Sequence, residues 1–207
     1  MPIIIVDYGA GNLRSVARAV AHAGYVPDVT DDPRALADAD AVIVPGVGAA
    51  ADTMRNLRGS GMVEPIREYI ASGRPFFGVC MGQQALFDVS EEGGEHECLG
   101  VLKGREVRLP DGLKVPHMGW NRVRQVRQHP IFEGIPDASY FYFVHSYVPA
   151  PEDPAVTIGK TDYGVTFPSV VANENVVATQ FHPEKSGEMG LRMYANFIKI
   201  ASMAPVP

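Results

Sequence analysis

Short apolar runs alternate with segments of helical period along the first half of the chain. Residues 3–7 form a β-branched apolar run, which is typical of a strand buried on both faces. After Asn12, a candidate N-cap, apolar residues recur on one helical face as far as Gly24. The pattern continues and predicts further strands at 26–29, 41–44 and 75–79, and helices at 62–70 and from 81 to about 89. Such repetition predicts a parallel sheet with right-handed crossovers.

Residues 98–180 follow a different pattern, in which short strand-like runs are separated by turn residues and show little helical period. The apolar run at 176–180 is predicted to return to the main sheet, and a closing helix is predicted from 187 to about 200. No internal repeat, low-complexity tract or linker interrupts the sequence. We therefore expect one α/β domain over residues 1–207, with a mixed, mostly parallel central sheet flanked by helices and a smaller antiparallel section.

Composition narrows the class of protein. Of the 207 residues, 46% are hydrophobic and 20% are charged, a balance typical of a folded globular chain. The net charge of −6 disfavours nucleic-acid binding, and no apolar run approaches the roughly 20 residues of a membrane-spanning helix. The first residues lack the basic region of a signal peptide. The two cysteines, Cys80 and Cys98, are therefore expected to be free thiols in a cytoplasmic protein.

Three segments resemble cofactor or metal motifs, but each lacks an essential part. Residues 7–14 lie between a strand and a helix, as a dinucleotide fingerprint would, yet Arg14 occupies the place of the third glycine. Residues 159–161 (GKT) resemble the end of a P-loop, but Pro154 replaces its first glycine. Residues 182–184 (HPE) match the H-x-E of zinc deaminases without the paired cysteines that complete that site. We expect neither a cofactor nor a metal.

The most informative segment is Gly78-Val79-Cys80-Met81-Gly82, which follows an apolar strand and precedes a predicted helix. It matches the G-x-S-x-G nucleophile elbow with Cys in place of Ser. The two glycines allow the tight turn, in which larger side chains would collide. The helix N-terminus favours the thiolate, and the Met81 N–H points toward a developing oxyanion. We therefore predict that Cys80 is a nucleophile.

A base is predicted near the end of the last strand, because catalytic groups gather at the carboxyl ends of parallel strands. His182 follows the apolar run at 176–180, and Glu184 can accept a hydrogen bond from its second imidazole nitrogen. The glycine-rich segment at 45–48 follows another strand. It is either the source of a second oxyanion N–H or an ordinary β–α turn.

These motifs resemble those of the class I (triad) glutamine amidotransferases: a G-V-C-x-G elbow, a P-G-V-G loop and a late H-P-E. Segments at 7–16, 115–121 and 182–186 resemble a branch of that family whose members are glutaminase subunits that supply ammonia to a separate cyclase subunit. Together with the elbow they are spread over nearly the whole chain in the expected order. The resemblance implies a flavodoxin-like fold and hydrolysis of L-glutamine through Cys80, His182 and Glu184.

The resemblance also implies roles for residues that the patterns alone do not single out. The backbones of Val47 and Met81 should supply the oxyanion N–H groups. Glutamine should be contacted by Gly46, Gly48, Gln84, Glu92, Ser146 and Tyr147. The interface with the cyclase subunit should include Asn12, His117, Met118, Trp120, Asn121, Tyr142 and Lys185. Two positions depart from the family pattern: Met81 replaces a leucine, and Gln83 replaces a methionine, which is expected to change the polarity of the pocket wall.

Other functions remain open at this stage. A stand-alone hydrolase of the same fold would fit the triad but would leave the segment around Trp120 without a role, and a glutaminase subunit of another class I amidotransferase would share the same motifs. A non-enzymatic interaction module would have no need of an intact Cys–His–Glu set. Trp120, the only tryptophan, is either an interface anchor or a core residue.

Overall fold

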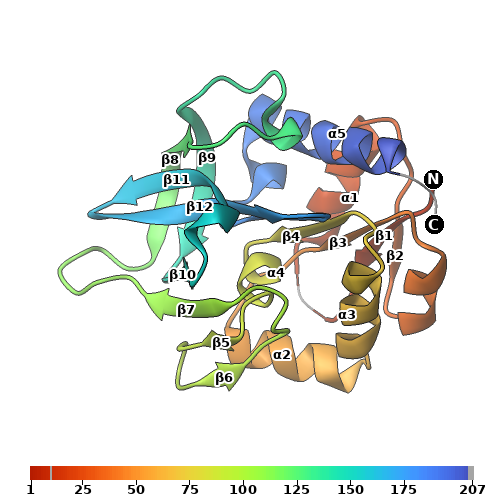
Figure 1. Cartoon of the computed structure of the whole chain (residues 1–207), viewed down its shortest axis with the longest axis horizontal. Coiled ribbons are helices and arrows are strands. Elements are labelled where there is room, and N and C mark those ends of the chain that lie inside the picture. Colours follow the sequence, from red (N-terminus) through yellow and green to blue (C-terminus); the bar gives the residue numbers. More distant parts are fainter. Residues whose placement is uncertain (10, 205–207) are drawn as a thin grey trace.

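The computed structural model describes residues 1–9 and 11–204, whose strands form a nine-stranded and a four-stranded sheet (Figure 1). In the larger sheet five neighbouring strands are parallel: β2 (Asp28–Thr30), β1 (Ile3–Val6), β3 (Ala41–Val44), β4 (Phe76–Val79) and β13 (Val176–Thr179). Antiparallel strands then continue the sheet in the order β12 (Val165–Asn173), β11 (Thr157–Tyr163), β8 (His117–Gln125) and β9 (Ser139–His145). The predicted mixed α/β fold is confirmed, although the antiparallel strands β12, β11, β8 and β9 contain more residues than the five parallel ones, so the antiparallel section is not the smaller part.

The smaller sheet carries the segments that face the end of β4. Its order is β10 (Tyr147–Pro151), β7 (Gly104–Arg108), β5 (Val89–Ser90) and β6 (His96–Glu97). β7 pairs antiparallel with β10 and in parallel with β5. This arrangement places the start of β10 and the turn after β5 near each other, although they are more than fifty residues apart in the sequence.

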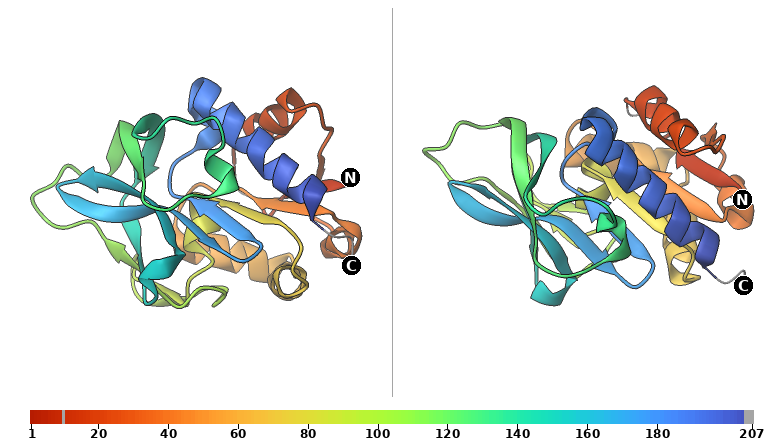
Figure 2. Two further views of the ribbon diagram at one scale, coloured as in Figure 1. Left: turned by 45° about the horizontal axis from the view of Figure 1, so that its top comes forward. Right: turned by 90° about the horizontal axis from the view of Figure 1, so that it is seen from above.

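Helices cover both faces of the parallel strands. α1 (Leu13–His22) and α5 (Gly187–Met203) pack side by side on one face, while α2 (Ala50–Gly59) and α3 (Val63–Ala71) cover the other (Figures 1 and 2). Alternate residues of β1 enter the two cores: Ile3 and Ile5 pack with α1 and α5, and Ile4 and Val6 pack with α2 and α3. A strand buried on both faces explains why its sequence is a continuous apolar run.

Two helices differ from the expectation based on sequence. The helix predicted from 81 to about 89 is only the single turn α4 (Met81–Gln84). It stops because the carbonyls of Ala85 and Leu86 accept hydrogen bonds from the backbone of residues 99–102. α2 was not predicted, because it has no side-chain N-cap and only two of its buried residues, Met54 and Leu57, are large and apolar. The other predicted helices and strands are present, with ends shifted by at most three residues and with the strand at 41–44 as predicted.

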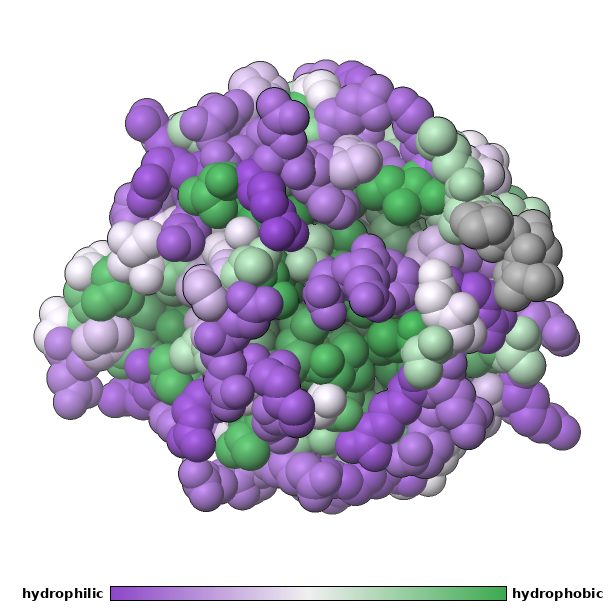
Figure 3. All heavy atoms as spheres, in the orientation of Figure 1, coloured by the Kyte–Doolittle hydropathy of each residue, from purple (hydrophilic) through white to green (hydrophobic). Residues whose placement is uncertain are grey.

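Within the described residues, short 3₁₀ helices span Pro33–Asp38, Pro130–Phe132, Pro154–Val156 and Pro183–Lys185. Each begins with proline, whose fixed φ suits the first helical position. No helix in the described part of the chain is both long and apolar enough to cross a membrane. The face seen in Figure 3 is mostly hydrophilic, with apolar surface between the polar side chains near its centre.

Candidate active site

Cys80 lies in a tight turn between β4 and α4. Its backbone adopts φ 52° and ψ −105°, a positive-φ conformation that costs a residue other than glycine on the order of 1–3 kcal/mol. The flanking glycines permit the turn. A Cβ at Gly82 would overlap the carbonyl of Val44, and one at Gly78 would lie 2.5 Å from the carbonyl oxygen of Gly82. The elbow geometry predicted from the sequence is therefore present.

The strands on either side of β4 bring two more loops to Cys80. β3 leads into the segment at 45–48, where a Cβ on Gly46 would lie 2.5 Å from the Cβ of Met81. β13 leads into the turn that carries His182. The order β3–β4–β13 therefore gathers the predicted glycine-rich loop, nucleophile and base at the carboxyl edge of the sheet.

His182 and Glu184 form a buried pair beside Cys80. Nδ1 of His182 lies 2.7 Å from Oε1 of Glu184, and both side chains are inaccessible to solvent. Since a carboxylate can only accept, Nδ1 carries the hydrogen, and Nε2 has no hydrogen-bond partner within the described residues. Burial alone lowers the pKa of His182, but the charges of Cys80 and Glu184 and hydrogen bonding to them outweigh it and raise this pKa. The arrangement favours the protonated imidazolium form of His182 beside the sulfur of Cys80.

Glu184 has neighbours that the sequence did not predict. The amide of Asn12 donates a hydrogen bond to Oε1, and α1 has no side-chain cap. Asn12 therefore occupies the predicted N-cap position of α1, with φ 79°, but its side chain caps no backbone N–H of the helix, because its amide lies against the triad. Tyr194 of α5 is buried near the same carboxylate, where burial raises the pKa of its hydroxyl and Glu184 raises it further. The only sequence signal for Tyr194 was a hydroxyl on an otherwise apolar helix face.

The surroundings of the sulfur also differ from the sequence-based expectation. α4 is a single turn, so the helix dipole near Cys80 is weaker than that of the longer helix predicted. Instead, Nε2 of the buried Gln180 lies 3.9 Å from Sγ of Cys80, at the limit for a hydrogen bond to sulfur. Gln180 was not singled out from the sequence, where it is merely the last residue of the strand predicted at 176–180.

A cavity of about 290 Å³ opens onto Cys80 and His182. Most residues predicted to bind glutamine or the oxyanion line it. Its wall comprises Val47, Gly48, Cys80, Met81, Gln84, Glu92, Val144, His145, Ser146, Tyr147, His182 and Lys185. Gly46 does not line the cavity but lets the 45–48 loop approach the elbow. Oε2 of Glu92 accepts a hydrogen bond from the Ala50 N–H at 2.7 Å, which fixes this carboxylate at the start of α2.

A larger cavity, of about 550 Å³, lies near the amino ends of β4 and β13. Pro75, Asn175 and Phe197 are among its lining residues, and no cysteine is. Cavity size therefore does not identify the site, whereas the meeting of nucleophile and base does. Among the residues that the structure describes, no group of three His, Cys, Asp or Glu side chains is placed to hold a metal ion.

The residues assigned by resemblance to a partner interface separate into two groups. Met118 and Trp120 are 61% and 55% exposed on β8, so the core alternative for Trp120 is wrong. Asn121 and Tyr142 are partly exposed, and Lys185 is exposed at the rim of the 290 Å³ cavity. His117 is only 3% exposed, because alternate residues of a strand face opposite sides. The side chain of His117 therefore points into the protein and is not presented to a partner.

Comparison with known proteins gives one family and one group of relatives. The family described as glutamine amidotransferase class-I matches residues 4–201. The chain is 54% identical over 199 residues to the imidazole glycerol phosphate synthase subunit HisH of Dehalococcoides mccartyi strain CBDB1, covering 96% of this chain and 97% of that protein. It is 51% identical over 195 residues to the protein of the same name from Desulfitobacterium hafniense strain DCB-2, covering 94% and 92%.

Solved structures share the fold at lower sequence identity. A crystal structure of a glutamine amidotransferase superposes with a TM-score of 0.77 at 22% identity, covering 97% of this chain and 99% of that chain. The structure of PurLQS from Thermotoga maritima gives a TM-score of 0.75 at 18% identity, covering 96% and 98%. At these sequence identities the similarity concerns the arrangement of helices and strands alone.

Proposed function

This chain belongs to the class I glutamine amidotransferases, and from that premise we propose that it is the glutamine-hydrolysing subunit of an imidazole glycerol phosphate synthase. The observation that carries the proposal is the meeting of Cys80 with the buried His182–Glu184 pair at the wall of the 290 Å³ cavity. Relatives of the same length at about half identity carry the synthase name. The amidotransferase domain proposed here covers residues 1–207.

The chemistry follows from the protonation states at the site. The Cys80 thiolate attacks the side-chain amide carbon of glutamine, and the backbone N–H groups of Val47 and Met81 stabilise the resulting oxyanion. The His182 imidazolium then gives its proton to the departing nitrogen, so that ammonia leaves and a glutamyl thioester remains. His182, now neutral, takes a proton from water, which hydrolyses the thioester to glutamate and regenerates the thiolate. Glu184 holds the imidazole in the required orientation throughout.

Gln84 and Glu92 supply acceptors for the α-ammonium group of the substrate. Nε2 of Gln84 donates to the carbonyl of Tyr147 at 3.1 Å and to Oε1 of Gln180 at 3.2 Å. Both amide hydrogens are thus engaged, and only Oε1 of Gln84 is left for a ligand. Glu92 adds a carboxylate to the same cavity wall. These two groups favour an amino acid with a free α-ammonium over a simple amide.

The proposed partner is the cyclase subunit, in a heterodimer that produces imidazole glycerol phosphate and AICAR in histidine biosynthesis. Its docking face is proposed to include Asn12, Met118, Trp120, Asn121, Tyr142 and Lys185, whereas His117 contributes only through its backbone. Exposed aromatic and methionine side chains such as Trp120 and Met118 are typical interface anchors. A covered interface also keeps ammonia from water until it reaches the cyclase. The reduced thiol that the reaction needs is consistent with the proposed cytoplasmic location.

The test is to measure ammonia release from glutamine by the chain alone and with a cyclase subunit from the same source. We expect release to require Cys80 and to rise when the loaded cyclase is added. Glutamine labelled at the amide nitrogen should label imidazole glycerol phosphate even in excess unlabelled ammonium. Full activity without a partner would favour a stand-alone hydrolase, and absence of label from the product would contradict the synthase assignment.

A further inference from the structure

Hydrogen bonds link the partly exposed β8 to the start of β10. Nδ2 of Asn121 lies 3.2 Å from Nε2 of His117, and Nδ1 of His117 lies 2.8 Å from Nε2 of His145. Nδ1 of His145 in turn lies 2.9 Å from the carbonyl oxygen of Tyr147. Both imidazoles are buried. The side chains of Asn121, His117 and His145 therefore form one continuous series of hydrogen bonds across two adjacent strands. The series ends at the carbonyl of Tyr147, a residue in the wall of the glutamine cavity.

The direction of every hydrogen bond in this series is fixed by its last member. A carbonyl can only accept, so Nδ1 of His145 carries hydrogen and its Nε2 accepts from His117. Nε2 of His117 is then an acceptor, which the amide of Asn121 satisfies. Burial lowers the pKa of His117 to about 4 and that of His145 to about 3, so both rings are neutral near pH 7 and each has one hydrogen to donate.

The same carbonyl connects this series to Cys80. The oxygen of Tyr147 also accepts from Nε2 of Gln84, whose second amide hydrogen goes to Oε1 of Gln180. The amide of Gln180 must therefore present its nitrogen to the other side, where Nε2 lies 3.9 Å from Sγ of Cys80. All donors and acceptors match from β8 to the sulfur, and no link needs an alternative orientation of an amide or a ring.

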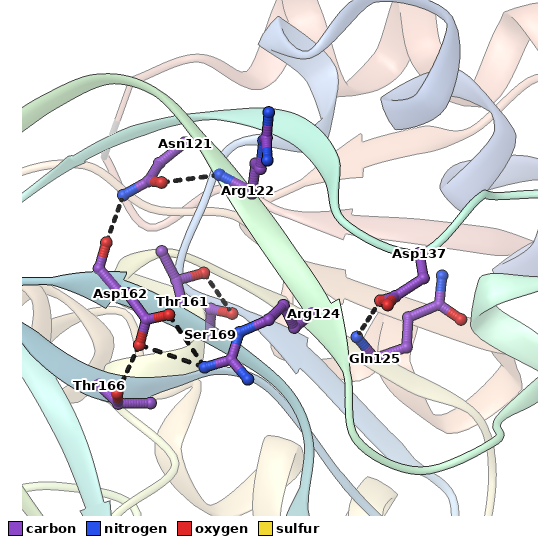
Figure 4. Close-up of polar contacts among 9 residues, drawn as sticks. All are labelled: Asn121, Arg122, Arg124, Gln125, Asp137, Thr161, Asp162, Thr166 and Ser169. Atoms are coloured by element: carbon purple, nitrogen blue, oxygen red, sulfur yellow. Dashed lines mark hydrogen bonds and ion pairs between the residues drawn. The ribbon is translucent and has the colours of Figure 1, made fainter.

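Asn121, at the β8 end of the series, is also held by hydrogen bonds to neighbouring backbone groups. Figure 4 shows the Asn121 amide between the backbone N–H of Arg122 and the carbonyl of Asp162, at 2.8 and 3.0 Å. Asp162 also accepts hydrogen bonds from Arg124 and Thr166. The Asn121 side chain is thus held in one orientation; it follows the exposed Trp120 in the sequence of β8 and faces the opposite side of the strand.

We propose that Gln180 is a positioning residue that donates an N–H to the Cys80 thiolate, and that the hydrogen-bonded series beginning at Asn121 holds it in that orientation. This inference deepens the proposed function and rests on it for the identity of the nucleophile. A neutral donor beside the sulfur stabilises the thiolate without an added charge, in a site where α4 offers only a single turn. The series also begins on the strand that carries the proposed cyclase contacts.

The test is the rate at which iodoacetamide alkylates Cys80 in the full-length chain without partner, near pH 7. Gln180→Met keeps the shape and removes the donor, and the rate should fall about tenfold because a hydrogen bond to a charged group is lost. His117→Phe keeps the aromatic packing against Phe143 and Tyr163 but breaks the series, and we expect a fall of severalfold. The matched control is Gln125→Met, the same change at a β8 side chain whose amide donates to the Ile135 carbonyl and, among the described residues, lies outside the series.

A second measurement separates positioning from general damage. In the complex with the cyclase, Gln180→Met should lower kcat with a smaller change in the KM for glutamine, whereas Glu92→Gln, at the cavity wall and outside the series, should raise the KM. Alkylation of Gln180→Met at the wild-type rate would overturn the proposal. If Gln180→Met does not fold, the test rests on His117→Phe: alkylation of Cys80 in that variant at the wild-type rate would overturn the proposal. Alkylation needs no partner, so its dependence on Gln180 can stand even if the complex releases no ammonia, which would count against the proposed function alone.

Discussion

The Asn12 side chain donates a hydrogen bond to the Glu184 carboxylate, at the oxygen that also receives the Nδ1–H of His182. Asn12 belongs to the loop before α1 and is also one of the residues proposed to meet the cyclase. One residue therefore touches both the triad and the proposed docking face. A partner that moves the Asn12 loop would alter the carboxylate that orients the base.

Replacement of Asn12 by alanine should lower glutaminase kcat in the complex by about tenfold. The loss leaves Glu184 with one donor fewer, and a hydrogen bond to a charged group contributes roughly 1.5–3 kcal/mol. The subunit should still fold, because Asn12 is partly exposed and its side chain makes no cap hydrogen bond to α1. Steady-state kinetics and a thermal melt measure the two effects. Arg14→Ala, an exposed change in the first turn of α1, is the control, and equal kcat values for both variants would contradict the role of Asn12.

Cys80→Ala should remove glutaminase activity by several orders of magnitude while the complex still makes product from added ammonium salt. The nucleophile is lost, but the cyclase chemistry lies in the partner. A glutamine-analogue electrophile should label Cys80 and not Cys98. Cys98 is buried, and burial together with the charge of Glu106 raises its pKa to about 11. Mass spectrometry of the labelled peptide decides the matter, and label at Cys98 would refute the site.

Trp120→Ala should weaken the complex by about ten- to a hundredfold in Kd, as expected for an aromatic anchor at the centre of an interface. The indole is 55% exposed in the free chain and contacts Tyr142 edge-on, so its removal leaves the core intact. Titration calorimetry gives the affinity, and a thermal melt of the free subunit should be nearly unchanged. Val126→Ala, another exposed apolar change beyond the end of β8, should leave the affinity as it is. Unfolding of the Trp120 variant would count against this prediction.

The 45–48 loop is expected to complete the oxyanion hole only when the cyclase is loaded, because free glutaminase activity would waste glutamine. Gly48 has φ 109°, and a Cβ there would meet no atom within 4 Å. Gly48→Ala therefore acts through backbone strain alone and should disturb any peptide flip at Val47. We expect stimulated activity to fall by about 10²–10³, the usual loss for one oxyanion donor, with little change in low basal activity. If Gly48→Ala has the same ratio of stimulated to basal glutaminase rate as the wild type, the proposed dependence of the oxyanion hole on the cyclase is wrong.

The two buried histidines make folding stability depend on pH. Their pKa values in the folded chain are about 4 for His117 and about 3 for His145, both lowered by burial from about 6.5. Between the folded-state pKa of each histidine and its unfolded-state pKa of about 6.5, the unfolded chain binds more protons than the folded one. The free energy of unfolding therefore falls as the pH drops below about 6.5. His117→Phe removes one such group and should weaken this dependence by up to about 1.4 kcal/mol per pH unit. Urea unfolding at several pH values measures it, and identical slopes for variant and wild type would contradict the assignment.

Local chemistry determined much of this protein from its sequence. The glycines around Cys80 indicate a tight backbone turn in which larger residues would collide. The continuous apolar runs indicate strands that are buried on both faces. Because parallel strands end at one edge, the sequence alone predicted that Cys80, His182 and the 45–48 loop would meet. These features need no knowledge of distant contacts.

The tertiary structure decided what depends on partners far apart in the chain. α4 ends early because residues 99–102 take its next carbonyls, and the amide of Asn12 goes to Glu184 instead of capping α1. Exposure of Trp120 and burial of His117 depend on which face of β8 meets the core, which the few apolar residues of this strand do not specify. Gln180 acquires its place beside the sulfur only because Tyr147 and Gln84 approach it across two sheets. A single sequence carries no signal for hydrogen bonds between residues so widely separated, since each depends on the final packing.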